Sequence, residues 1–284
     1  MSRVFLKFFL FLALSCAPAM HAACVWKVTR DDGKLLYLGG SVHALRKSDY
    51  PLPASYAQAF DASSRLALEV DRQSLFGLNK VLDNEGKYRH GDSLKNHVDP
   101  RTYAWLRRLF ELMNIPEESF LQYKPWYIVE ILQSGSTHRA MPDMGVDEFL
   151  MRRAEKKSMP VVGLESMMEH ARVFSGLSDR ESEILLLTTF IPTASNPALR
   201  DKLISAWRRG DSEALMQMTK KGFDEFPAFG ERLLDARNRA WIPKIESYFA
   251  SGKIYFVVVG SAHFGGSNGV LALLRAKGYQ IEQM

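Results

Sequence analysis

The stretch Ile254-Tyr-Phe-Val-Val-Val-Gly-Ser-Ala-His-Phe-Gly-Gly266 decides the predicted fold. An apolar run that is rich in β-branched residues and bounded by glycine is typical of a strand buried on both faces. The chain then breaks at Gly260, presents His263, and resumes as an apolar-periodic helix from about Gly269. Ligands of open α/β sheets gather beyond the carboxyl ends of the strands, which is where His263 is expected.

A second copy of this pattern lies near the other end of the chain. It is Leu35-Leu-Tyr-Leu-Gly-Gly-Ser-Val-His43, so a strand is again followed by Gly-Ser-x-His. The two copies run from Gly40 to His43 and from Gly260 to His263. Two histidines in matching strand-end positions predict one site that is assembled across the fold.

The rest of the chain supplies the other elements of an α/β domain. Strands are predicted at 25–28, 35–39, 65–70, 160–164, 254–259 and 279–282, and the first two flank a hairpin turn of the Asp-Gly type at Asp31-Asp-Gly-Lys34. From Asp71 to about Met159 the pattern is mostly helical, the capping box Ser178-Asp-Arg-Glu181 opens an apolar helix, and further helices are predicted at 198–209, 211–221 and 233–249. We therefore predict a single α/β domain with a central sheet built from both ends of the chain and a helical block inserted between.

Length and composition suit an ordinary globular protein. The chain has 284 residues, of which 46% are hydrophobic and 24% charged, so it is long enough to bury a core. The formal net charge is +5, and removal of Arg3 and Lys7 with an export signal would leave 5 − 2 = +3. A positive charge this small and scattered gives no reason to expect a nucleic-acid partner.

The first residues predict export. A basic start is followed by the apolar centre Phe8-Phe-Leu-Phe-Leu-Ala-Leu14 and by small residues up to Ala23, which is typical of a secretory signal. We predict a signal peptide at 1–23, a domain at 24–284, and a periplasmic or secreted protein without a transmembrane segment in the mature chain. Leu14-Ser-Cys16 leaves a lipid anchor as a minor alternative. Cys24 would then be the lone mature cysteine, so no internal disulfide is expected.

Four candidate site residues stand at predicted strand ends: His43, Glu69, Glu165 and His263. Two imidazoles with one or two carboxylates are a usual ligand set for Zn, Mn, Co or Fe(II). Such an ion would polarise a carbonyl or phosphoryl oxygen, with a nearby carboxylate as general base. Each residue also has a plain structural explanation: the histidines can cap turns, Glu69 can pair with a cation, and Glu165 can stabilise a helix start.

Other residues carry weaker signals. Arg237 and Arg239 lie on the predicted helix 233–249, where an arginine is usually solvated. The glycines at 265, 266 and 269 precede a helix and can either cradle an anion or form a tight turn. The histidines at 90, 97, 138 and 170 lie in polar or helical surroundings and are predicted to be surface residues. The sequence contains no HExxH, no G-x-S-x-G and no Walker loop, so the commonest hydrolase mechanisms lack support.

Several short motifs, taken together in order and spacing, resemble a known family. They are Leu38-Gly-Gly-Ser-Val-His43, Ala67-Leu-Glu-Val-Asp71, Lys124-Pro-Trp126, Gly145-Val-Asp147, Gly163-Leu-Glu165, Ala206-Trp207 with Gly210-Asp211, Arg237-Asn238 and Gly260-Ser-Ala-His263. From about Val25 to Glu282 the chain resembles the TraB/GumN proteins, relatives of the Tiki metalloproteases and the pheromone-shutdown proteins. The resemblance implies a fold related to the erythromycin esterase and ChaN-like superfamily.

The resemblance also implies site roles. The metal-dependent peptidase site of the Tiki branch, with its paired Gly-x-x-His motifs and strand-end glutamate, falls on His43, Glu69 and His263 in this sequence. Arg237 matches the Arg-Asn element of the family, whereas Glu165 matches a recurring position without an assigned role. Peptidase activity belongs to the Tiki branch, so a GumN-like chain can carry the same site for another substrate.

These observations predict an exported, metal-dependent hydrolase that cleaves a peptide or amide, or another small molecule. His43 and His263 would be metal ligands, and Glu69 a ligand or general base. Arg237 would bind a substrate carboxylate or the developing oxyanion. The alternative is a non-enzymatic envelope protein that holds a small ligand or metal complex in the same cleft. A purely structural role for both Gly-x-x-His motifs is the third interpretation.

Overall fold

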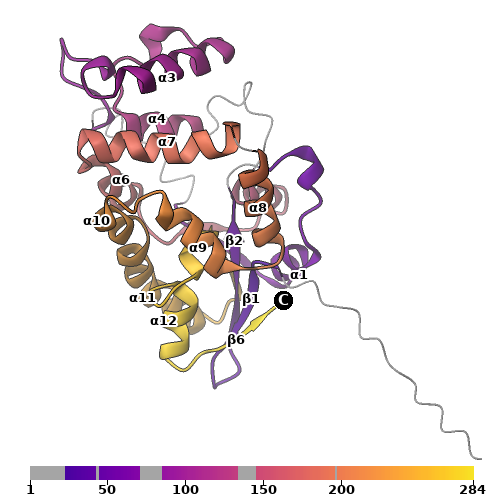
Figure 1. Cartoon of the computed structure of the whole chain (residues 1–284). Helices are drawn as coiled ribbons and strands as arrows, with labels where there is room; N and C mark the ends of the chain where they lie inside the picture. Colours follow the sequence, from indigo (N-terminus) through magenta and orange to yellow (C-terminus); the bar gives the residue numbers. More distant parts are fainter. Residues whose placement is uncertain (1–22, 43–44, 71–84, 134–144, 196) are drawn as a thin grey trace, which may run out of the picture.

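The computed structural model describes residues 23–42, 45–70, 85–133, 145–195 and 197–284, and within them six strands form one mixed sheet. The strands are β1 (Val25–Thr29), β2 (Leu35–Ser41), β3 (Arg65–Leu68), β4 (Val161–Gly163), β5 (Tyr255–Gly260) and β6 (Gln280–Gln283). Their order is β4-β3-β5-β2-β1-β6. All but β4 come from the two ends of the chain, so the predicted α/β fold with an inserted helical block is confirmed (Figure 1).

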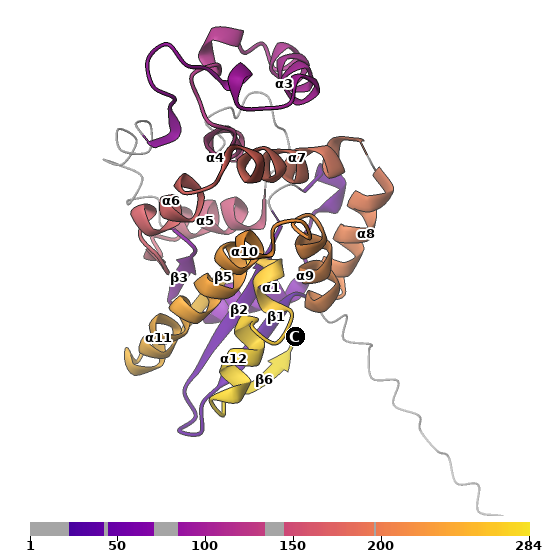
Figure 2. The same ribbon diagram turned by 60° about the vertical axis from the view of Figure 1, so that its left-hand side comes forward.

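Helices cover the sheet and form a separate block at one end of it. The helices are α1 (Ala54–Ala62), α3 (Pro100–Leu112), α4 (Pro125–Gln133), α5 (Val146–Lys156), α6 (Met167–Ser175), α7 (Asp179–Ser195), α8 (Pro197–Arg208), α9 (Ser212–Lys221), α10 (Pro227–Gly230), α11 (Ala236–Ala250) and α12 (Val270–Ala276). Short turns are η1 (Lys47–Asp49), η3 (Leu94–Asn96), η4 (Glu117–Ser119), the π-turn η5 (Glu231–Asp235) and η6 (Ser261–Phe264). In both views α3 lies farthest from the sheet, with α4 and α7 between them (Figures 1 and 2).

The predicted buried strand is the centre of the sheet. Phe256, Val257, Val258 and Val259 are all at most 2% exposed. Successive side chains of a strand point to opposite faces, so both faces of β5 are covered. β5 pairs in parallel with β2 on one side and with β3 on the other, and β3 pairs in parallel with β4. The carboxyl ends of these four strands therefore share one edge of the sheet.

The hairpin at the amino-terminal end also forms as predicted. β1 and β2 pair antiparallel, with Val25 opposite Gly39 and Thr29 opposite Leu35. Gly33 in the connecting turn has a φ of 80°, a conformation that glycine adopts without a steric penalty. β6 pairs antiparallel with β1 and closes the sheet on that side.

The helical block has an apolar core of its own, distinct from the core of the sheet. Its buried residues include Leu106 and Phe110 of α3, Trp126 of α4 and Leu186 of α7. The predicted starts of two helices are confirmed. Asp99 caps α3 ahead of Pro100, with its side chain accepting from the backbone N of Arg101, and the Ser178–Glu181 capping box opens α7.

His97 forms hydrogen bonds with two carboxylates and so connects the segment before α3 to α7. His97 Nδ1 lies 2.7 Å from Asp179 Oδ2, and its Nε2 lies 2.7 Å from Asp92 Oδ2. The ring also stacks on Tyr88, with centroids 4.2 Å apart. The prediction that His97 is a surface histidine without a partner is therefore wrong, because its partners lie far away in sequence or on a loop that the periodicity does not describe.

His97 should make stability depend on pH. Burial lowers the pKa of His97, but the bonds to Asp179 and Asp92 outweigh burial and leave the pKa above its ordinary value. A raised pKa contributes stability below the unfolded pKa of about 6.5, and this is lost as pH rises through the folded pKa. We expect His97→Gln to lower the free energy of unfolding by about 1 kcal/mol or less at pH 5.5 and by less at pH 9. Urea unfolding at both pH values checks this, with exposed His90→Gln as control. A stability difference between wild type and His97→Gln that is larger at pH 9 than at pH 5.5 would contradict it.

The predicted signal peptide lies almost wholly outside the described residues, and cleavage and export stay predictions. Within the described ranges, no helix combines the length and apolarity that a membrane crossing requires. Cys24 is buried and free, and burial raises the pKa of its thiol to about 12. A thiol held protonated in this way is a poor nucleophile.

Candidate active site

Three of the four predicted strand-end residues meet at the carboxyl edge of the sheet. Glu69 directly follows β3, Glu165 follows β4 after one intervening residue, and His263 lies in η6 directly after β5. The pairing of β3 with β4 continues past the strand ends, since the backbone N of Glu165 donates to the carbonyl of Glu69 at 3.0 Å. The parallel order β4-β3-β5 therefore brings these side chains together.

The fourth predicted residue, His43, lies outside the described residues. The end of β2 is described up to Val42, and Ser41 stands opposite Gly260 in the parallel register. Ser261 Oγ also donates to the carbonyl of Ser41 at 2.8 Å. The two Gly-Ser segments therefore lie side by side at the same edge, and the role of His43 stays a prediction.

Arg237 is the centre of the cluster. It enters from α11, whose preceding π-turn η5 directs both Arg237 and Asn238 into the protein, with 7% and 1% exposure. The guanidinium donates to Glu69 Oε2, to Glu165 Oε1 at 2.7 Å and Oε2 at 3.2 Å, to the carbonyl of Leu233 at 3.2 Å, and faces His263 Nε2 at 3.3 Å. The rule that helical arginines are usually solvated fails here, whereas Arg239 follows it, because it is 48% exposed and pairs with Glu231.

All the hydrogen-bonding capacity of Arg237 is used within the protein. A guanidinium has five N–H donors, and the five acceptors just described account for all of them. One planar face of the guanidinium is also covered by Trp241, since the guanidinium carbon lies 4.6 Å from the centroid of the Trp241 ring. The predicted contact between Arg237 and a substrate oxygen therefore requires that the substrate replace one of these acceptors.

Both glutamates are held ionised. Burial would raise the pKa of Glu69, but Arg237, His263 and the N–H of Gly260, 2.8 Å from Oε1, outweigh it and leave the pKa well below its ordinary value. Burial likewise opposes ionisation of Glu165, and bonds from His170 and Arg237 again leave its pKa lowered. Burial alone would lower the pKa of Arg237, and the two carboxylates raise it. The two carboxylates and the guanidinium together carry −2 + 1 = −1, and each imidazole that is protonated adds +1.

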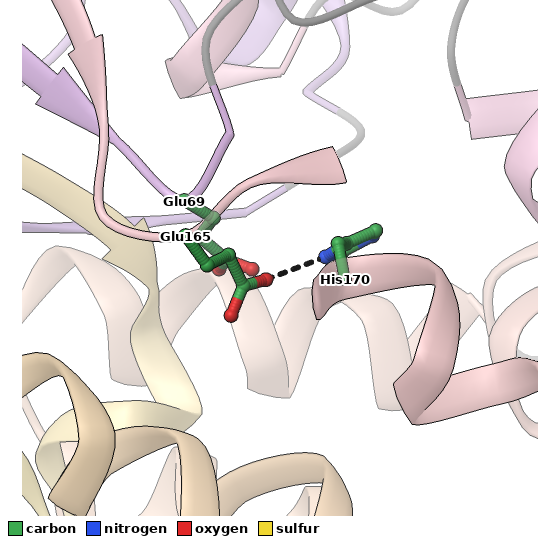
Figure 3. A group of neighbouring side chains, drawn as sticks. All are labelled: Glu69, Glu165 and His170. Atoms are coloured by element: carbon green, nitrogen blue, oxygen red, sulfur yellow. Dashed lines mark hydrogen bonds and ion pairs between the residues drawn. The ribbon is translucent and has the colours of Figure 1, made fainter. Parts of the chain in front are cut away.

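His170 is a member of the cluster that the sequence interpretation missed. It lies on α6, just after the Ser166–Glu169 capping box, and its Nδ1 is 2.7 Å from Glu165 Oε1 (Figure 3). Its side chain is only 15% exposed, so the prediction of a surface histidine is wrong. One feature of the sequence could have indicated this: His170 lies one turn into the helix that directly follows Glu165.

His263 lies on the other side of Arg237. It is 3% exposed, and its ring centroid is 4.6 Å from that of Trp241. Its Nδ1 lies 2.6 Å from Asn238 Oδ1, and its Nε2 lies 3.9 Å from Glu69 Oε1. Trp241 Nε1 in turn donates to Glu165 Oε2 at 3.0 Å. The segments that follow β3, β4 and β5 thus each supply one polar side chain of the cluster, and α11 supplies Arg237, Asn238 and Trp241.

The donor atoms suit a divalent metal ion. Glu69, Glu165 and His170 offer ligand atoms that all lie within 4.8 Å of one another. His263 Nε2 and Glu69 Oε1, at 3.9 Å, are also within reach of one ion, because two bonds of about 2.0–2.2 Å span up to about 4.4 Å. Carboxylates with imidazoles fit Zn, Mn, Co and Fe(II). Arg237 occupies part of this space: its Nη2 donates to Glu69 Oε2, and its Nη1 faces His263 Nε2, so an ion that binds His263 must displace Nη1.

The glycines after His263 form a turn whose N–H groups serve the protein itself. The backbone N of Gly266 donates to Glu213 Oε2 at 2.8 Å, and a φ of 76° places Gly266 in the left-handed region. The tight-turn interpretation of these glycines therefore accounts for them without a bound anion.

A protein-family model matches this chain. The model of the TraB/PrgY/gumN family covers residues 24–283, nearly the whole chain. The chain belongs to the TraB/PrgY/gumN family. Among curated proteins, none matches this chain significantly.

Family membership confirms the resemblance drawn from the motifs. In this TraB/PrgY/gumN protein, the Ala67-Leu-Glu, Gly163-Leu-Glu165, Arg237-Asn238 and Gly260-Ser-Ala-His263 segments all end at the same cluster. Residues that are far apart in sequence and share one location argue for one function. The match itself names a family and no reaction.

Proposed function

We propose that this TraB/PrgY/gumN protein is an exported hydrolase that cleaves a peptide or amide bond with the aid of a divalent metal ion. The observation that carries the proposal is the cluster of two ionised glutamates and two imidazoles around one guanidinium. When both imidazoles are neutral, the two carboxylates and one guanidinium leave a charge of −1 at this largely buried strand edge, which favours an additional cation.

The ligands in this proposal are Glu69 and His263, with His43 from the matching motif. A bound divalent ion supplies Lewis-acid chemistry, polarising the substrate carbonyl and making water easier to deprotonate. Glu69 is either a ligand of the ion or the general base, and it is the more exposed of the two glutamates, at 21% against 7% for Glu165.

Glu165 and Arg237 hold the site in place. Both oxygens of Glu165 already accept from His170, Arg237 and Trp241. Arg237 bonds to both glutamates at once and so fixes the separation of their carboxylates. A rigid arrangement of this kind supports catalysis because the polar groups need no reorganisation during the reaction.

Hydrolysis with and without metal tests the proposal. Purified protein is incubated with a mixture of synthetic peptides in the presence of Mn²⁺, Co²⁺, Zn²⁺ or Fe²⁺ or of a chelator, and cleavage is followed by mass spectrometry. We expect cleavage that stops on chelation and returns on adding metal. Glu69→Gln should lower the rate by at least about 100-fold, with exposed Glu118→Gln as the matched control.

The metal content of Glu69→Gln separates the two roles of this residue. Retained metal with lost turnover identifies a general base, and loss of both identifies a ligand. Cleavage that survives chelation and the Glu69→Gln change would overturn the proposed function. Ligand binding without any turnover would favour the alternative, a binding protein of the envelope.

A further inference from the structure

The proton on His263 is placed by its neighbours. Asn238 Nδ2 lies 2.9 Å from the backbone carbonyl oxygen of Asn268, which can only accept. The amide nitrogen of Asn238 must therefore face Asn268, and its Oδ1 must face His263 Nδ1, at 2.6 Å. An amide oxygen only accepts, so Nδ1 of His263 carries the hydrogen.

The opposite side of the ring leads to the same assignment. Arg237 Nη1 lies 3.3 Å from His263 Nε2, and a guanidinium can only donate. Nε2 of the neutral ring is therefore an acceptor. Two independent contacts, one on each nitrogen, specify the same tautomer, with Nδ1 protonated and Nε2 carrying a lone pair.

Asn268, whose backbone carbonyl orients Asn238, is fixed by hydrogen bonds of its own. Asn268 Nδ2 donates to Asp235 Oδ2 at 3.2 Å, and Asp235 also accepts from Lys220 at 3.1 and 3.2 Å. The Gly266 N–H bond to Glu213 fixes the other end of the same loop. The loop between η6 and α12 is thereby tied to α9 and to η5.

We propose that Asn238, oriented by Asn268, is a positioning residue that fixes the His263 tautomer so that Nε2 keeps its lone pair, which faces Arg237 Nη1 at 3.3 Å with Glu69 Oε1 3.9 Å away. The inference rests on the proposed function, since it is this lone pair that would bind a metal ion or accept a proton once Arg237 Nη1 gives it up. Hydrogen bonds to the far nitrogen of a ligating histidine set both its tautomer and its orientation. Asn238 and Arg237 form the Arg-Asn pair, and they contact opposite nitrogens of the same His263 ring: Asn238 faces Nδ1 and Arg237 faces Nε2.

Long-range ¹H–¹⁵N spectra of the metal-free protein at pH 8.5 test this inference, with His263 assigned by comparison with His263→Gln. The wild type should carry the proton on Nδ1. Asn238→Ala should shift the ring toward the Nε2-protonated form, and Asn238→Asp, which keeps an acceptor, should retain the proton on Nδ1. Circular dichroism confirms folding, and the wild-type spectrum decides the tautomer even if Asn238→Ala fails to fold.

Metal affinity provides the second readout. Loss of a hydrogen-bond partner behind a ligand should weaken Zn²⁺ binding in Asn238→Ala by roughly 10–100-fold, with less loss in Asn238→Asp. A wild-type ring protonated on Nε2, or an Asn238→Ala variant with unchanged tautomer and affinity, would overturn the inference. A wild type with the expected tautomer but no metal binding and no hydrolysis would instead contradict the proposed function alone.

Discussion

Replacement of Arg237 by Met should lower the free energy of unfolding at pH 7 by about 3–5 kcal/mol. The guanidinium is 7% exposed and is the shared partner of Glu69 and Glu165. Its removal leaves two carboxylates at a largely buried edge without their cation, and such groups cost far more than the loss of a surface ion pair. Thermal and urea unfolding, analysed as a two-state process, measure the effect.

The same variant should invert the pH dependence of the site. The lowered pKa values of Glu69 and Glu165 in the wild type contribute stability above their unfolded pKa of about 4.3, which is lost as pH falls. Without Arg237, burial should raise these pKa values, so that protonation favours the folded state. The stability difference between wild type and Arg237→Met should therefore shrink as pH falls from 7 to 4.

Two further variants serve as controls for Arg237→Met. Arg239→Met removes an arginine two residues away on the same helix that is 48% exposed, and it should change stability by less than about 1 kcal/mol. Adding Glu165→Gln to Arg237→Met removes one of the stranded charges and should recover part of the loss, giving non-additive energies. An Arg237→Met protein as stable as the Arg239→Met protein would contradict the buried ion-pair network.

The sequence was sufficient to predict those residues of the site that directly follow strands. Glu69, Glu165 and His263 each follow an apolar run, and polar residues beyond parallel strands share one edge of a sheet. The order of the strands could not be read from the sequence, because it is set by packing between segments that are distant along the chain. The prediction of shared location therefore rested on repeated motifs.

Arg237 and His170 show what such patterns leave out. Spacing on a helix gives the direction of Arg237 only if the helix is regular, and the π-turn η5 precedes it. Family resemblance alone raised the expectation for that residue. His170 has no motif of its own, and its only distinguishing property is contact with Glu165, which is a tertiary fact. The structure also adds Asn238 and Trp241, whose roles come from hydrogen bonds rather than from spacing.

Two ligand sets are open to a metal ion in this cluster. The first combines Glu69 and His263 with the predicted ligand His43. The second is the group of Glu69, Glu165 and His170, whose donor atoms lie within 4.8 Å. Both include Glu69, so histidine variants distinguish them. Loss of one imidazole from a mononuclear site should remove most of the affinity, because an ion needs several ligands from a rigid scaffold.

The most direct test of the account is the metal content of untagged protein after reconstitution with Zn²⁺ or Mn²⁺ and removal of excess ion. Elemental analysis per mole of folded monomer is measured for wild type, His263→Ala, His170→Ala and the exposed control His90→Ala, with circular dichroism to confirm folding. We predict about one ion in the wild type and in His90→Ala, near-complete loss in His263→Ala, and retention in His170→Ala. Metal retained by His263→Ala and lost from His170→Ala would place the ion on the second ligand set, and a wild type that holds no ion would contradict the metal-dependent site itself.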